Sequence, residues 1–160
     1  MLGLDVAVKA FEGGPPIRDA GQSRQLKELL KWIGAPLVYR AETPLPRRGD
    51  LLEYRRWDLT LDGHGERSAV EFESRLCDIQ LQLGRWRRKQ RDDPVCSLLI
   101  VVAATRANRR VLADMGDSLI ADFPRLRTAS VRRLLRAGRH PPTGLILLAA
   151  PARRNLRRGA

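Results

Sequence analysis

The stretch from Arg55 to Gln82, RRWDLTLDGHGERSAVEFESRLCDIQLQ, contains two runs in which apolar and polar residues alternate. Alternation is typical of a half-buried strand, because successive side chains point to opposite faces. The first run places on one face Trp57, Leu59 and Leu61, and on the other face Asp58, Thr60 and Asp62. The second run places Val70 and Phe72 opposite Glu71 and Glu73. The intervening DGHGE is typical of a tight reversal, so the stretch predicts a β-hairpin.

A turn centred between His64 and Gly65 sets Asp58 directly across from Glu71. Side chains at paired positions have Cβ atoms about 4.5 to 5.5 Å apart, and Glu73 lies on the same face as Glu71. Three carboxylates are therefore expected to converge. A hard divalent cation such as Mg²⁺, which proteins bind through one or two carboxylates, would relieve their repulsion. The alternative is an exposed hairpin face that is merely acidic.

Composition describes a globular chain of 160 residues with a strong positive charge, +12 at pH 7 and an isoelectric point near 11.2. We expect one domain over residues 1–150 and a basic tail over 151–160. The charge favours a polyanionic partner, nucleic acid before an acidic membrane surface. The alternative is that an arginine-rich surface reflects genomic base composition alone.

Neither a signal peptide nor an apolar run long enough to cross a bilayer is expected, which predicts a cytoplasmic protein without membrane contact. Cys77 and Cys96 have no CxxC or nearby histidine partner, so they are expected to be reduced and partly buried. His64 and His140 lack metal-ligand spacing and are expected to be exposed loop residues.

The segments before the hairpin predict a strand over 2–10, a helix, and a strand over 37–43. The helix is defined by residues at helical spacing, Leu26, Leu29, Leu30 and Ile33, and Gly34 is placed to end it. After the hairpin the period changes to 3.6, in an apolar stripe of Leu76, Ile79, Leu83 and Trp86. One flank of this second helix carries Arg75, Asp78, Gln82, Arg85 and Lys89, and the other carries Gln80.

Residues 98–104, LLIVVAA, form a continuous apolar run, which indicates a central strand covered on both faces. Thr105 is expected to cap a third helix that Pro124 closes, with Leu119 on its apolar side. A short helix over 129–137 and a last strand over 145–149 follow. This order predicts an α/β fold, a mixed central sheet with helices on both faces.

An acidic residue on one hairpin strand, Glu-x-Glu on the next and a glutamine-bearing helix after it resemble the PD-(D/E)xK nuclease superfamily. The matching residues are Asp58, Glu71, Glu73 and either Gln80 or Gln82. The resemblance implies an αβββαβ restriction-endonuclease-like core. More narrowly, RRWDLTLDG, AVEFESRLCDIQ and LLIVVAATRANRRVL resemble the nuclease-like domain of actinobacterial regulators, where it follows a helix-turn-helix of the phage-repressor type.

Two positions depart from the pattern. The superfamily usually has lysine where Glu73 stands, although some restriction endonucleases carry glutamate there. The proline that names the motif is replaced by Trp57, next to Asp58.

The resemblance implies metal-dependent phosphodiester hydrolysis with Mg²⁺ or Mn²⁺. Asp58 and Glu71 would hold the cation, and Glu73 would act as a general base or share a second cation. Arg75 would stabilise charge on the phosphate, or instead form a structural ion pair. Gln80 would stand beside the site, or instead be a surface hydrogen-bonding residue.

Basic residues expected to contact nucleic acid, DNA rather than RNA, are Arg47, Arg48, Arg85, Arg88 and Lys89. The alternative function is a catalytically inactive module of the same fold that binds DNA in regulation or serves for dimerisation. A homodimer and a helix-turn-helix protein are both possible partners.

Overall fold

The computed structural model describes residues 20–46, 55–115 and 121–149. The strand expected over 2–10, Arg47, Arg48, Leu119 and the tail over 151–160 lie outside the described residues. The described elements, in chain order, are α1 (Ala20–Leu30), β1 (Val38–Pro44), β2 (Arg56–Gly63), β3 (Glu66–Glu73), α2 (Ile79–Asp92), β4 (Ser97–Ala103), α3 (Arg106–Asp114), α5 (Thr128–Arg136) and β5 (Gly144–Leu148).

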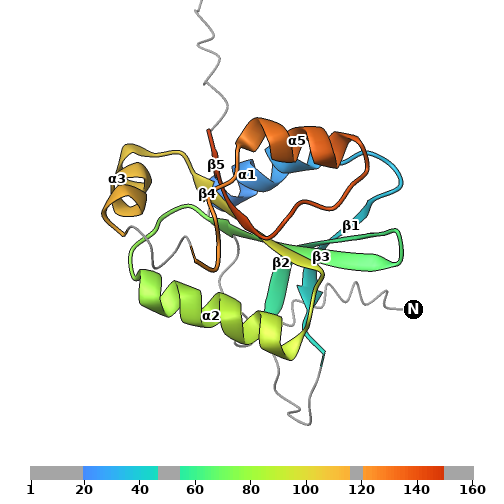
Figure 1. Cartoon of the computed structure of the whole chain (residues 1–160), viewed down its shortest axis with the longest axis horizontal. Helices are drawn as coiled ribbons and strands as arrows, with labels where there is room; N and C mark the ends of the chain where they lie inside the picture. Colours follow the sequence, from blue (N-terminus) through green and yellow to red (C-terminus); the bar gives the residue numbers. More distant parts are fainter. Residues whose placement is uncertain (1–19, 47–54, 116–120, 150–160) are drawn as a thin grey trace, which may run out of the picture.

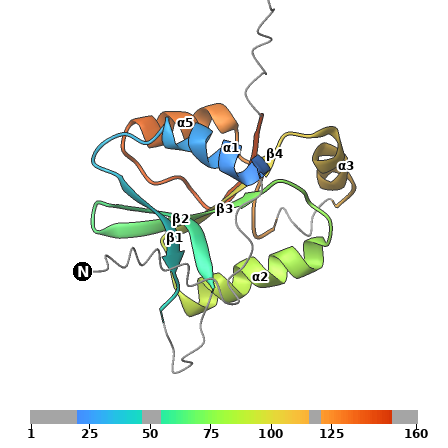
Figure 2. The ribbon, with the colours of Figure 1, turned by 180° about the vertical axis from the view of Figure 1, so that it is seen from behind.

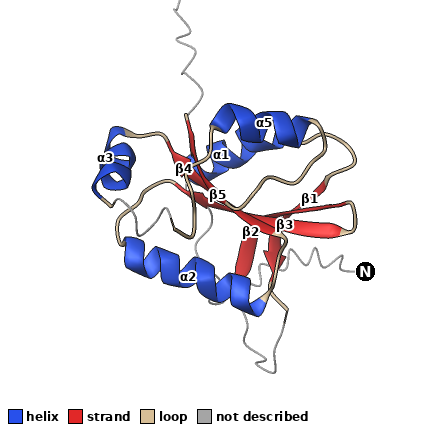
Figure 3. Cartoon of the chain, viewed as in Figure 1, coloured by secondary structure: helices blue, strands red, loops and turns tan. Residues whose placement is uncertain are grey.

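The strands form one five-stranded sheet in the order β1-β2-β3-β4-β5 (Figure 3). β1, β2 and β3 are antiparallel neighbours, whereas β3, β4 and β5 run parallel. The mixed sheet and the order from α1 to β4 confirm the predicted α/β fold and are compatible with an αβββαβ core.

Helices cover both faces of this sheet (Figures 1 and 2). α1 and α5 lie side by side on one face, where Leu29, Val131 and Leu135 pack on strand residues of the first apolar cluster. α2 lies on the opposite face, where Leu83 and Trp86 belong to a second cluster. The central β4 supplies residues to both clusters, as the continuous apolar run predicts.

The hairpin turn between β2 and β3 has the predicted register. Gly63 pairs with Glu66, so the reversal is centred between His64 and Gly65. Both central residues have positive φ, 54° and 75°, as a two-residue type I′ turn requires. The register predicted from the sequence is therefore confirmed as far as the pair Leu59 and Val70.

Trp57 does not share a face with Leu59 and Leu61, contrary to the prediction from alternation. Leu59 and Leu61 belong to the cluster under α1 and α5, whereas Trp57 packs against α2. The regular pairing of β2 with β3 ends at Leu59. Residues before Leu59 therefore do not have to keep the alternation of faces that pairing with β3 imposes. The indole Nε1 then donates to Asp93 Oδ2, at 2.8 Å, near the end of α2.

α5 follows its sequence signals, whereas α3 begins as predicted but ends at Asp114, well before the Pro124 expected to close it. Thr105 caps α3 as predicted, and its hydroxyl oxygen accepts from the backbone N–H of Asn108 at 3.1 Å. α5 ends just before Gly138, which has a φ of 67°. Both cysteines are exposed, which corrects the expectation of partial burial: Cys77 precedes α2 and Cys96 precedes β4 at the end of the sheet.

Candidate functional site

Asp58 and Glu71 meet where β2 and β3 part. The carboxylate Oδ2 of Asp58 accepts a hydrogen bond from the backbone N–H of Phe72 at 2.8 Å. The backbone N–H of Asp58 donates to Glu71 Oε1 at 3.3 Å. Side chains here take the place of ladder hydrogen bonds, so the gap between the strands is lined by carboxylate oxygens. The predicted proximity of Asp58 and Glu71 is confirmed.

Glu71 is buried and ion-paired with Lys89, which reaches it from the last turns of α2. Lys89 Nζ lies 2.8 and 2.9 Å from the two carboxylate oxygens of Glu71 and also donates to the carbonyl oxygen of Arg56. The ammonium group stands 5.4 Å from the ring centroid of Trp57. Burial, with the neighbouring charge of Asp58, raises the pKa of Glu71 to about 7, although Lys89 opposes this.

Glu73 is also buried, and two side chains of α2 hold it. Gln82 Nε2 donates to Glu73 Oε2 at 3.0 Å, and Arg85 forms an ion pair with Glu73 Oε1. Burial raises the pKa of Glu73, and the positive charge of Arg85 acts in the opposite direction. Glu73 is therefore anchored toward α2.

The carboxylates of Asp58, Glu71 and Glu73, which we call the acidic cluster, affect one another's pKa values. They do not lie close enough together to act as one set of metal ligands. The charge of Asp58 raises the pKa of both Glu71 and Glu73, so all three lie within one electrostatic neighbourhood. Among the described residues, however, their oxygens do not all lie within 4.8 Å of one another. This corrects the expected three-carboxylate metal site. The physical reason is that Gln82 and Arg85 hold Glu73 toward α2.

A divalent cation still fits the donor set of Asp58 and Glu71. Mg²⁺ takes one or two protein carboxylates and completes its octahedron with water and phosphate oxygens. Asp58 is half-buried, so solvent reaches part of its side chain. These two carboxylates, and not Glu73, are the residues that could hold the cation.

The structure does not bring Arg75 and Gln80 into this cluster. Arg75 is exposed, and its contribution is a backbone carbonyl that accepts from Gln82 Nε2 at 3.2 Å. Gln80 is exposed on α2, so of the two candidate glutamines it is Gln82 that stands beside Glu73.

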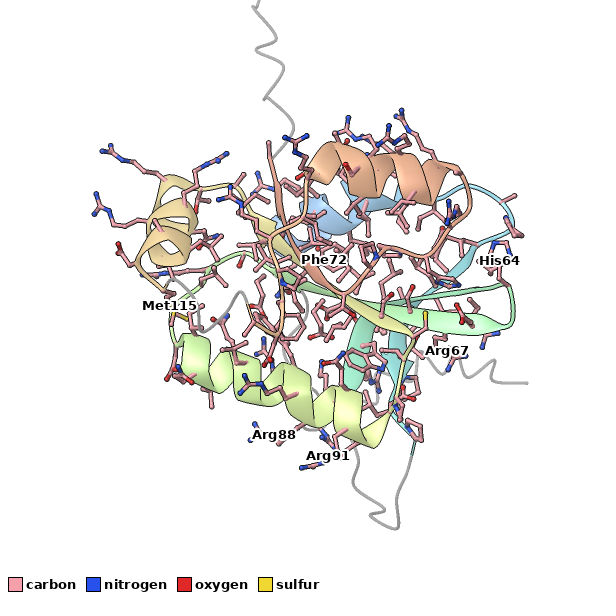
Figure 4. The ribbon with its side chains drawn as sticks, in the orientation of Figure 1. His64, Arg67, Phe72, Arg88, Arg91 and Met115 are labelled. Carbon is pink, nitrogen blue, oxygen red and sulfur yellow. The ribbon has the colours of Figure 1, made fainter. Side chains whose placement is uncertain are left out.

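The basic residues expected to contact nucleic acid differ in their exposure to solvent. Arg88 is exposed and projects from the outer side of α2 (Figure 4). Lys89 is buried at the carboxylates, which corrects its assignment to a nucleic-acid surface, and Arg85 is shared between Glu73 and solvent. Helical spacing places Gln82, Arg85 and Lys89 on one flank of the helix. That spacing was the available signal, but it does not reveal that the flank faces buried acids.

Exposed arginines also stand on α3 and α5, from which nitrogen-tipped side chains project as they do from α2 (Figure 4). On α3 they are Arg106, Arg109 and Arg110, of which the first and last line a shallow pocket. α3 is tied to the segment after Glu73, because the buried Asn108 accepts from the backbone N–H of Leu76 and donates to the carbonyl of Ser74. This basic helix therefore adjoins the acidic cluster.

The chain matches no protein-family model, no curated protein and no solved structure. None of the helices among the described residues has the length and apolar character needed to span a membrane. The class that the fold and the cluster define is an α/β domain with a buried, lysine-paired carboxylate site beside a basic helix.

Proposed function

We propose that this domain is a metal-dependent phosphodiesterase that acts on nucleic acid, and on DNA rather than RNA. The observation that supports the proposal is the meeting of Asp58 and Glu71 at the parting of β2 and β3, beside the buried ammonium group of Lys89. The proposal includes a cytoplasmic location, where nucleic acid and free Mg²⁺ both occur.

In the proposed mechanism Asp58 and Glu71 hold Mg²⁺ or Mn²⁺. When bound, such a cation polarises a phosphate oxygen and lowers the pKa of its water. Lys89 favours the ionised form of Glu71 and fixes its orientation, because its ammonium group contacts both carboxylate oxygens. Lys89 supplies the positive charge that PD-(D/E)xK nucleases usually take from a lysine at the position of Glu73.

Glu73 and Arg85 have a supporting part in this proposal. Gln82 fixes one oxygen of Glu73, which leaves the other oxygen to position the guanidinium of Arg85. The Arg85 side chain is 45% exposed, so it can reach an incoming phosphate without a change in the fold. The arginines of α3 extend the basic surface away from the cluster and would follow the phosphate backbone.

A second candidate function is favoured by one observation: cations of the chain already neutralise two of the three carboxylates. On this alternative the domain keeps the scaffold and binds DNA without cutting it, in regulation, as a homodimer or beside a helix-turn-helix protein. Lys89 and Arg85 would then be structural substitutes for the cation.

Cleavage of a supercoiled plasmid, with Mg²⁺, with Mn²⁺ and with a chelator, separates the two functions. Asp58→Asn keeps an oxygen that can accept from the Phe72 N–H but removes the charge. We expect this variant to lose at least about a hundredfold in rate, since the cation supplies several kcal/mol of transition-state stabilisation. Asp62→Asn, on the same strand and paired with Arg67, is the matched control and should cut normally.

Plasmid that is retarded on a gel but stays intact with either metal would establish the binding module instead. Cleavage that persists in Asp58→Asn or without metal would refute the proposed site.

A further inference from the structure

We infer that Glu66, Cys96 and His140 form a second metal site, of the zinc-binding type, at the turn end of the sheet. One carboxylate oxygen, the thiol sulfur and one imidazole nitrogen all lie within 4.8 Å of one another. The three residues are far apart in the sequence. None of them takes part in the acidic cluster described above.

The topology of the sheet brings these residues together. β3, β4 and β5 are adjacent and parallel, so the starts of all three lie at the same edge. Glu66 begins β3, Cys96 directly precedes β4, and His140 lies in the loop that leads into β5. The backbone N–H of Cys96 donates to the carbonyl of Arg67 at 2.8 Å, which fixes the cysteine against β3.

Hydrogen bonds at both ring nitrogens fix the imidazole of His140 at this edge of the sheet. Its Nε2 lies 2.9 Å from the carbonyl oxygen of Gly63, and since a carbonyl only accepts, Nε2 carries the hydrogen. Nδ1 therefore keeps its lone pair, which the hydroxyl of Ser68 contacts at 2.9 Å. Metal-binding histidines commonly donate their second N–H to a carbonyl in this way. A metal bound at Nδ1 would take the place of the Ser68 oxygen, so the Ser68 side chain would turn to another rotamer. His140 is thus not the free loop histidine expected from the sequence.

The donor types select the metal. A thiolate and an imidazole favour Zn²⁺ over Mg²⁺, and a carboxylate completes a three-ligand set that leaves a fourth tetrahedral position for water or a further ligand. Glu66 and Cys96 are exposed, so solvent and a cation reach the cluster directly.

The site is separate from the acidic cluster. Seven positions along β3 divide Glu66 from Glu73, roughly 23 Å at the rise of an extended strand. In Figure 4 His64 marks the hairpin end, and Phe72, the neighbour of Glu71 and Glu73 in β3, lies in the middle of the molecule. The proposed zinc-type site can therefore be refuted while the proposed nuclease function stands, and the nuclease function can be refuted while the zinc-type site stands.

Cobalt(II) is the probe that tests this site, because thiolate ligation gives it a strong charge-transfer absorption that carboxylates and Mg²⁺ do not produce. We expect the full-length chain, reduced and freed of metal, to take up one equivalent of Co²⁺ with this band, and Zn²⁺ but not Mg²⁺ to displace it. Cys96→Ser should abolish the band, and Glu66→Gln should weaken Co²⁺ binding at least about tenfold.

The chain contains its own control, since Cys77 is the other cysteine and is also exposed. Cys77→Ser should keep the band unchanged. The proposal is overturned if the native chain shows no thiolate band, if Cys96→Ser retains it, or if Cys77→Ser removes it. His140→Gln would also disturb the hydrogen bonds to Gly63 and Ser68, so the test uses the cysteine and glutamate variants and not this one.

Discussion

At the scale of single residues, the pair Glu71 and Lys89 shows burial and ion pairing in opposition. Removing a carboxylate from water favours its neutral form, whereas an ammonium group in contact favours the ionised form. The pKa of Glu71 nevertheless rises to about 7, because burial and the charge of Asp58 together outweigh Lys89. Glu71 therefore changes charge close to neutral pH, where its capacity to hold a cation also changes.

This pKa shift has a defined effect on stability. Between pH 4.5 and about 7 the native protein keeps a proton on Glu71 that the unfolded chain releases, so the free energy of unfolding falls as pH rises through this window. Each unit of difference between the folded and unfolded pKa contributes about 1.4 kcal/mol. Glu73 acts in the same direction. Urea midpoints measured from pH 4.5 to 8 should therefore decline.

Glu71→Gln tests the origin of that decline. At pH 5 the variant should lie within about 1 kcal/mol of the native protein, because glutamine has nearly the shape of the protonated carboxyl group, and its midpoint should depend less on pH. Glu28→Gln is the control: Lys31 lowers the pKa of Glu28, so its loss should leave the decline intact. A native midpoint that rises from pH 4.5 to 7 would contradict the assignment.

At the scale of elements, α1 and α5 approach so closely that their ends leave no room for side chains. Gly34 follows α1, and its N–H donates to the carbonyl of Leu135 at 2.9 Å. A Cβ at Gly138, just after α5, would lie 2.0 Å from the carbonyl oxygen of Ala35. Backbone contact between these two segments fixes the helix pair over its face of the sheet.

Two glycines of similar φ allow steric overlap to be separated from backbone strain. Gly138 and Gly65 have φ of 67° and 75°, but nothing lies within 4 Å of a Cβ at Gly65. We expect Gly65→Ala to cost about 1 kcal/mol through strain alone, and Gly138→Ala to cost about 1 to 3 kcal/mol more. Thermal or urea unfolding measures both. Equal losses would mean that α1 and α5 separate readily.

The elements could largely be predicted from sequence because they depend on local periodicity. The alternation around His64 and Gly65 sufficed for the register of the hairpin, and hence for the meeting of Asp58 and Glu71. Trp57 was misplaced because its face depends on where β3 stops pairing, which alternation does not encode. Lys89 was assigned to solvent for a similar reason: helical spacing groups it with Arg85 but does not say what that flank faces.

At the scale of the whole molecule, the charged side chains of the described residues are unevenly distributed. Acidic side chains line the gap between β2 and β3, whereas exposed arginines stand on α2, α3 and α5. α3 adjoins the acidic cluster through Asn108, and α5 covers the other face with α1. We therefore expect DNA bound at the cluster to contact α3 and not α5, which makes these two helices distinguishable by experiment.

The affinity for a short DNA duplex, measured over a range of salt concentrations, tests this arrangement. Each phosphate contact contributes about 0.9 to the slope of log affinity against log salt, so the double variant Arg106→Ala and Arg110→Ala should lower the slope by about 2. The double variant Arg133→Ala and Arg136→Ala removes the same charge from α5, so a slope near the native value is expected. If both double variants lower the slope equally, the positive charge acts as a diffuse field, and DNA does not approach Asp58 and Glu71 along α3.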